Sequence, residues 1–148
     1  MIPCFGRRRP PRPILPIRWH APCGTRLTIL STESCQYYAF FCNIATPESH
    51  PWLWNTLVHD FGHDRVAKGG FPEIWPANAF IGNYLRLDLL DRYGLKEELY
   101  ENIKGYFTYM AEQTGTLWEL VSDDASCNHG FASHVIYWMD RLGLISHE

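Results

Sequence analysis

From Ser31 onward, apolar side chains recur every three or four residues, which is the spacing of one helix face. The clearest case is a stripe formed by Leu99, Ile103, Phe107 and Met110. No stretch alternates apolar and polar residues as a half-buried strand does. The pattern therefore predicts an all-α fold of antiparallel helical hairpins. Five helices are expected, over residues 31–45, 49–61, 76–93, 96–112 and 130–142.

Residues 1–30 differ from this pattern in composition. They hold six of the ten prolines and six arginines, and the first acid of the chain is Glu33. Proline lacks a backbone N–H and fixes φ, so this stretch can form neither a helix nor a central strand. The sequence predicts a basic, proline-rich, disordered extension, with a P-x-x-P ligand for an aromatic groove as the alternative. The folded unit is expected to span 31–148.

Beyond the extension the chain is acidic, with seven lysines and arginines against sixteen aspartates and glutamates. This balance argues against nucleic acid as a partner, because phosphate binding needs clustered basic side chains. No apolar run approaches the ~20 residues of a membrane-spanning helix. Five cysteines without a C-x-x-C pair give no support for a zinc site. His59 and His63 are four apart, but Gly62 ends the helix between them, and we expect no metal and no cofactor.

The segment between the last two predicted helices reads TGTLWELVSDDASCNHGFASH and carries the most suggestive chemistry. Trp118 offers a flat apolar face to a sugar ring, while Glu119, Asn128 and His129 can bond to hydroxyl groups. A purely structural interpretation is also open, in which Trp118 is core, Glu119 a solvated charge and Asn128 a helix cap. Glu73, in the loop FPEIWP, either lines the same pocket or is a loop-end charge.

The ordered fragments STESCQYYAF, PEIWPANAFIGNYLRLDLL, TGTLWE and ASCNHGFASHVIYW resemble the C-terminal part of the catalytic domain of bacterial alpha-L-rhamnosidases. The resemblance covers about residues 31–144. It implies an (α/α)6 toroid of six helical hairpins, and inverting hydrolysis of terminal alpha-L-rhamnosides without a cofactor. It also implies that Glu119 is the general base, that Asn128 and His129 contact the sugar, and that Trp118 is a pocket wall.

Inverting hydrolysis also needs a proton donor, a second carboxyl group ~6.5–9.5 Å from the base. In the family this acid lies in an acidic motif further towards the N-terminus, and no such motif precedes Ser31. Five predicted helices also fall short of the twelve of a toroid. We therefore expect an incomplete toroid, inactive in isolation, whose partner is the missing N-terminal part of the domain. The alternative is a non-catalytic remnant or a helical carbohydrate-binding module.

Overall fold

The computed structural model describes residues 32–146, and this part of the chain is helical and contains no strand. The proline-rich extension predicted for residues 1–30 lies outside the described residues. None of the helices within 32–146 is long and apolar enough to span a membrane. The elements are α1 (Glu33–Phe41), α2 (Pro51–Asn55), the π-helical turn η1 (Thr56–Asp60), α3 (Ile81–Arg92), α4 (Lys96–Ile103), the π-helical turn η2 (Lys104–Thr108), α5 (Tyr109–Thr114), the 3-10 helix η3 (Gly130–His134) and α6 (Val135–Arg141).

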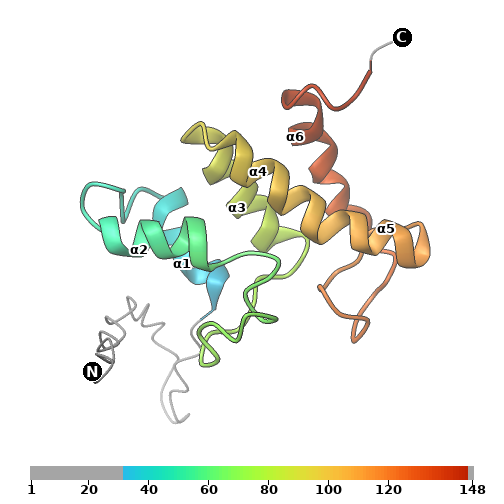
Figure 1. Cartoon of the computed structure of the whole chain (residues 1–148), viewed down its shortest axis with the longest axis horizontal. Helices are drawn as coiled ribbons and strands as arrows, with labels where there is room; N and C mark the ends of the chain where they lie inside the picture. Colours follow the sequence, from blue (N-terminus) through green and yellow to red (C-terminus); the bar gives the residue numbers. More distant parts are fainter. Residues whose placement is uncertain (1–31, 147–148) are drawn as a thin grey trace, which may run out of the picture.

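Helix α3 is the centre of the arrangement. It contacts α1 on one side and α4 and α6 on the others. In Figure 1, α4, η2 and α5 follow one another in a single long diagonal rod that crosses in front of α3, while α6 rises above the middle of this rod. Two long loops, over residues 61–80 and 115–129, lie below the rod (Figure 1). The fold therefore places both aromatic loops on one side of a helical layer.

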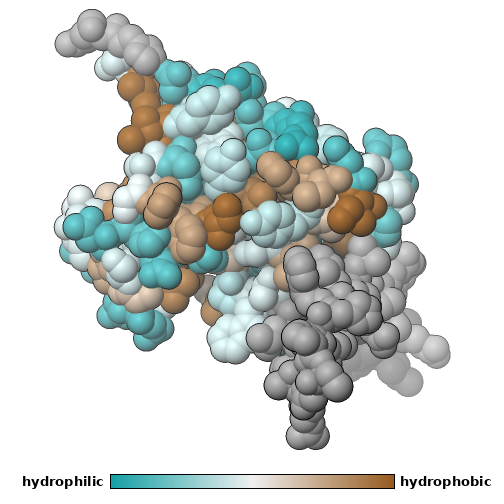
Figure 2. Space-filling view, turned by 180° about the vertical axis from the view of Figure 1, so that it is seen from behind, coloured by the Kyte–Doolittle hydropathy of each residue, from teal (hydrophilic) through white to brown (hydrophobic). Residues whose placement is uncertain are grey.

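The core is built around α3, which buries most of its circumference, including Leu85, Leu87, Leu89 and Leu90, and leaves one stripe through Ile81 and Tyr84 exposed. The stripe predicted on the fourth helix is confirmed, because Leu99, Ile103, Phe107 and Met110 are all buried. From behind, hydrophobic residues still reach the surface at several places across the middle of the molecule (Figure 2). The most exposed large apolar side chains are Ile44 and Phe131, at 74% and 76%.

The predicted helices are present, but two of their ends were wrong. Thr32 does cap α1, since its Oγ1 accepts a hydrogen bond from the Cys35 N–H at 3.1 Å. However, α1 ends at Phe41 rather than residue 45. Asn43 then takes a left-handed conformation, with φ of 55°, and this stops the helix. The third helix begins at Ile81 rather than Pro76.

A buried guanidinium joins three of the elements. Arg86 on α3 donates hydrogen bonds to the carbonyls of Leu57, Val58 (3.1 Å) and Phe61 (3.0 Å) in and after η1. Its Nε also donates to Oδ1 of Asn102 on α4 at 2.7 Å. A π-turn leaves carbonyls that the next turn does not satisfy, and Arg86 supplies their donors.

Candidate functional site

The loop between α5 and η3 is closed on itself by backbone hydrogen bonds. The His129 N–H donates to the Leu117 carbonyl at 2.7 Å, and the Glu119 N–H donates to the Ser126 carbonyl at 2.8 Å. The hydroxyl of Thr116 also donates to the Cys127 carbonyl. These bonds bring the T-L-W-E segment alongside the Asn-His segment, as a site made from both requires.

Glu119 is held from both sides through its backbone. While its N–H bonds to Ser126, its carbonyl accepts a hydrogen bond from the Ala79 N–H at 2.8 Å, in the segment before α3. Its side chain is half-buried, and the carboxylate forms no hydrogen bond or ion pair with any residue in 32–146. A fixed backbone with an unpaired carboxylate leaves both oxygens available to accept a proton from water.

Trp118 is buried and faces the core. Its indole Nε1 donates to Oγ1 of Thr114 at 2.7 Å, and its ring packs edge-on to Tyr109 with centroids 5.6 Å apart. A buried indole whose N–H is satisfied gives the loop a rigid attachment to α5. In this structure Trp118 therefore positions the neighbouring Glu119.

Asn128 is exposed and His129 is half-buried. The His129 ring lies between two phenylalanines, with centroids 4.8 Å from Phe80 and 5.7 Å from Phe131. Its Nε2 atom is buried and has no hydrogen-bond partner among the described residues. A buried polar atom without a partner costs about 1–3 kcal/mol, so a ligand hydroxyl at this atom would offset that cost.

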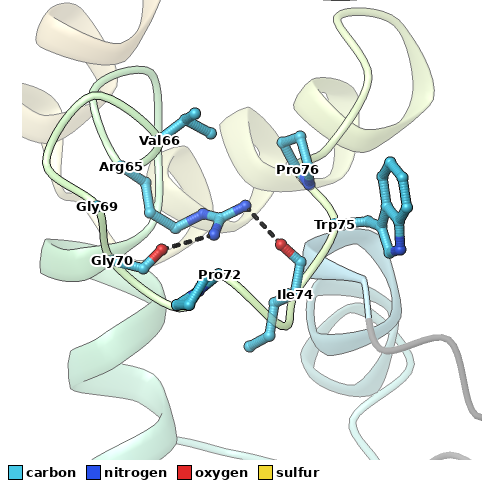
Figure 3. A pocket seen from close by; sticks show the side chains of 8 residues that line it. All are labelled: Arg65, Val66, Gly69, Gly70, Pro72, Ile74, Trp75 and Pro76. Atoms are coloured by element: carbon cyan, nitrogen blue, oxygen red, sulfur yellow. Dashed lines mark hydrogen bonds between the residues drawn. The ribbon is translucent and has the colours of Figure 1, made fainter.

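The loop that carries Glu73 is organised by a different carboxylate, Glu33, which the sequence analysis did not single out. Glu33 and Arg65 form a buried ion pair, at 0% and 2% exposure. Arg65 extends across the loop and donates to the carbonyls of Gly70 and Ile74, each at 2.9 Å (Figure 3). Glu73 itself is exposed, and its side chain makes no hydrogen bond or ion pair with residues 32–146.

This loop also lines an open pocket of about 370 Å³. Figure 3 shows the indole of Trp75 at its outer edge, near Pro76, and Arg65 across its inner side. Glu73 is not among the lining residues. Neither is Glu119, so this pocket is not one that the two glutamates share.

The remaining candidate residues, His59 and His63, lie apart from the Glu119 loop. His59 and His63 lie at a separate cleft of about 180 Å³ with Asp64, Glu98 and Glu101. Within residues 32–146, no three histidine, cysteine, aspartate or glutamate side chains come close enough together to hold a metal ion.

Three aromatic residues grouped near His129 were not predicted as site residues: Phe80, Tyr84 and Phe131. With Ile81 and His134 they line a cleft of about 260 Å³. Phe80 and Tyr84 fall within the range 76–93 predicted as a helix, whereas in the structure residues 76–80 are not helical and the Phe80 ring packs on His129. The one signal for them in the sequence was the large apolar residue Phe131 directly after Asn-His-Gly.

The chain was compared with protein-family models, with curated proteins and with solved structures, and none of the three comparisons gave a match.

Proposed function

We propose that this chain is part of an inverting glycoside hydrolase resembling the alpha-L-rhamnosidases, with Glu119 as its general base. Asn128 and His129 contact the sugar, and the helical hairpins form part of an (α/α)6 toroid. The natural substrate class is terminal alpha-L-rhamnosides. The chemistry needs no cofactor.

One observation carries the proposal, namely the backbone bonding of Glu119 to both Ala79 and Ser126. These two contacts join three of the four sequence fragments on which the resemblance rests, although the bonded residues lie up to 47 positions apart in the chain. The same loop places the unpaired Nε2 of His129 nearby, where a sugar hydroxyl would complete its hydrogen bonding. A carboxylate and a histidine gathered by backbone bonds are suited to holding a sugar and activating water.

In the proposed reaction, the Glu119 carboxylate removes a proton from a water molecule as that water attacks the anomeric carbon. The glycosidic oxygen leaves with a proton from a second carboxyl group. Asp123 and Asp124 are exposed, and Asp124 already accepts a hydrogen bond from the Ser122 hydroxyl at 2.8 Å. We therefore propose that the acid comes from another polypeptide segment that packs against this one.

A substrate that needs no acid tests the base by itself. Fluoride leaves without protonation, so alpha-L-rhamnosyl fluoride should be hydrolysed by the chain with Glu119 intact. The variant Glu119→Gln should release fluoride 10²–10⁴-fold more slowly, the usual contribution of a general base. The control Glu112→Gln alters an exposed glutamate on α5 and should leave the rate unchanged.

Proton NMR of the first product adds a second readout, since inversion gives beta-L-rhamnose before mutarotation. Fluoride release by Glu119→Gln at the unmodified rate would refute the assignment of the base. Binding of rhamnose without any fluoride release would instead favour the alternative, a helical carbohydrate-binding module. The orphaned Nε2 of His129 would serve either function equally.

A further inference from the structure

An apolar cleft lies directly beside the Glu119 loop. It has a volume of about 260 Å³ and is lined by Phe80, Ile81, Tyr84, Phe131 and His134. Phe80 and Ile81 come from the start of α3, while Phe131 and His134 come from η3. The cleft therefore lies between the two segments that flank the proposed catalytic loop.

The cleft lies next to His129, which belongs to the proposed sugar site. The ring of His129 contacts Phe80 at 4.8 Å and Phe131 at 5.7 Å, and both phenylalanines line the cleft. Phe80 also follows Ala79, whose N–H bonds to the Glu119 carbonyl at 2.8 Å. A substrate whose sugar contacts His129 thus has the cleft next to it for its other portion.

The lining is aromatic and uncharged. The His134 ring packs edge-on to Tyr84, Phe107 and Trp138, with centroids 5.6, 6.0 and 5.4 Å away. Burial lowers the pKa of His134, although the backbone at Ala79 and Phe80 opposes part of that effect, so its imidazole is neutral at pH 7. No Lys, Arg, Asp or Glu lines the cleft.

Of the lining side chains, only Tyr84 and His134 carry a group that can form a hydrogen bond. Most hydroxyl groups of a second sugar would stay unpaired there, and each hydroxyl buried without a partner costs free energy. The lining suits an apolar ring, which gains both area burial and ring stacking against aromatic side chains. The volume is ample, since an engineered cavity of about 150 Å³ lined by apolar side chains binds benzene. Phe131, at 76% exposure, is the side chain with the most surface to bury on such a ligand.

We propose that this cleft holds the leaving group of the substrate and selects rhamnosides whose aglycone is an apolar ring over those whose aglycone is another sugar. The inference rests on the proposed function, because it is the sugar bound at His129 that directs the leaving group into the cleft. Phe131 is then a specificity-determining residue.

Isothermal titration calorimetry on the full chain tests this with phenyl alpha-L-rhamnoside, methyl alpha-L-rhamnoside and phenol. We expect the phenyl glycoside to bind about 10–100-fold more tightly than the methyl glycoside, which is the gain from burying one such ring. Phe131→Ala should abolish most of that difference, and the loss of an exposed side chain should not unfold the chain. The control Ile136→Ala removes an exposed apolar side chain of α6 outside the cleft and should preserve the difference.

The two proposals fail in different ways. Equal binding of both rhamnosides would overturn the cleft assignment and leave the sugar site intact. A third outcome is that phenol binds, that Phe131→Ala abolishes phenol binding, and that neither rhamnoside binds more tightly than phenol. The cleft would then bind apolar rings without a sugar site beside it, and it would not be a leaving-group site. No binding of any of the three probes would overturn both proposals.

Discussion

Replacing Glu33 by glutamine should strongly destabilise the fold, although Glu33 lies outside the candidate site. Its carboxylate pairs with the buried guanidinium of Arg65 and accepts hydrogen bonds from the Tyr37 hydroxyl at 3.1 Å and the Ala77 N–H at 3.0 Å. Glutamine has the same size but no charge. The variant therefore leaves the Arg65 charge buried without a counter-charge, and breaking a buried ion pair in this way costs about 3–5 kcal/mol.

Urea denaturation followed by circular dichroism at 222 nm measures this loss. With a dependence of about 1–3 kcal/mol per molar urea, the midpoint should fall by roughly 2 M. Such a change is a large part of the total stability of about 5–15 kcal/mol typical of a domain. A matched control is Asp64→Asn, which breaks the exposed ion pair of Asp64 with Lys68 and should cost only about 0–1 kcal/mol.

The reasoning fails if Glu33→Gln shifts the midpoint no more than Asp64→Asn does. It also fails if the double variant Glu33→Gln/Arg65→Met is no more stable than Glu33→Gln alone. Removing the orphaned charge should recover part of the loss, because an apolar side chain is cheaper to bury than an unpaired guanidinium.

Three smaller perturbations can be measured by the same urea titrations. Gly82→Ala should destabilise the fold by about 1–3 kcal/mol despite alanine's better helix propensity, because the new Cβ would lie 2.7 Å from the Cβ of Ala77. The control Gly130→Ala has open space around the new Cβ and should change stability by less than about 0.5 kcal/mol, so equal effects of the two variants would contradict the packing argument. Thr114→Val should cost about 1–3 kcal/mol by leaving the Trp118 N–H without its acceptor, and a neutral result would show that the indole finds another. Burial lowers the pKa of His134 in the folded chain, so as the pH falls the unfolded chain protonates this histidine first, and stability should decrease below about pH 6.5. The variant His134→Leu should lose less stability than the unmodified chain between about pH 7.5 and 5.5. An equal loss would show that His134 does not cause this pH dependence.

The helices were predictable because their signals are local, whereas the wrong ends were decided by distant residues. The sequence shows Pro76 as a good first residue for a helix, and the spacing of apolar residues supports that start. In the structure, the N–H groups of Ala77 and Ala79 bond instead to the Glu33 carboxylate and the Glu119 carbonyl, at 3.0 and 2.8 Å. These partners lie about 40 residues away on either side, so no local pattern reveals them.

The early end of the first helix has a local cause in the sequence, at Asn43. Asn43 tolerates the left-handed conformation, and the N–H groups of Ile44 and Ala45 both return to the Ala39 carbonyl, at 2.8 and 3.0 Å. That is the bonding of a helix C-terminus, and it leaves Ile44, which lies inside the range predicted as helix, exposed to solvent.

The candidate site was predictable as a segment but not as a geometry. Residue types drew attention to Glu119, Asn128 and His129, and the structure does place them in one closed loop. The sequence could not show that Trp118 faces the core or that Phe80 packs on His129, because both depend on the path of a loop fixed by long-range hydrogen bonds.

The position of Arg86 has a consequence for how the molecule opens. Its single guanidinium on α3 bonds to both η1 and α4. If one of these elements unfolds, buried donors or acceptors in the others lose their hydrogen-bond partners. Amide protons of α2–η1 and of α4 should therefore exchange with deuterium at similar rates, as one cooperative unit. The helical layer behind the candidate site should thus open as a whole rather than helix by helix, and a ligand bound beside it meets a closed wall.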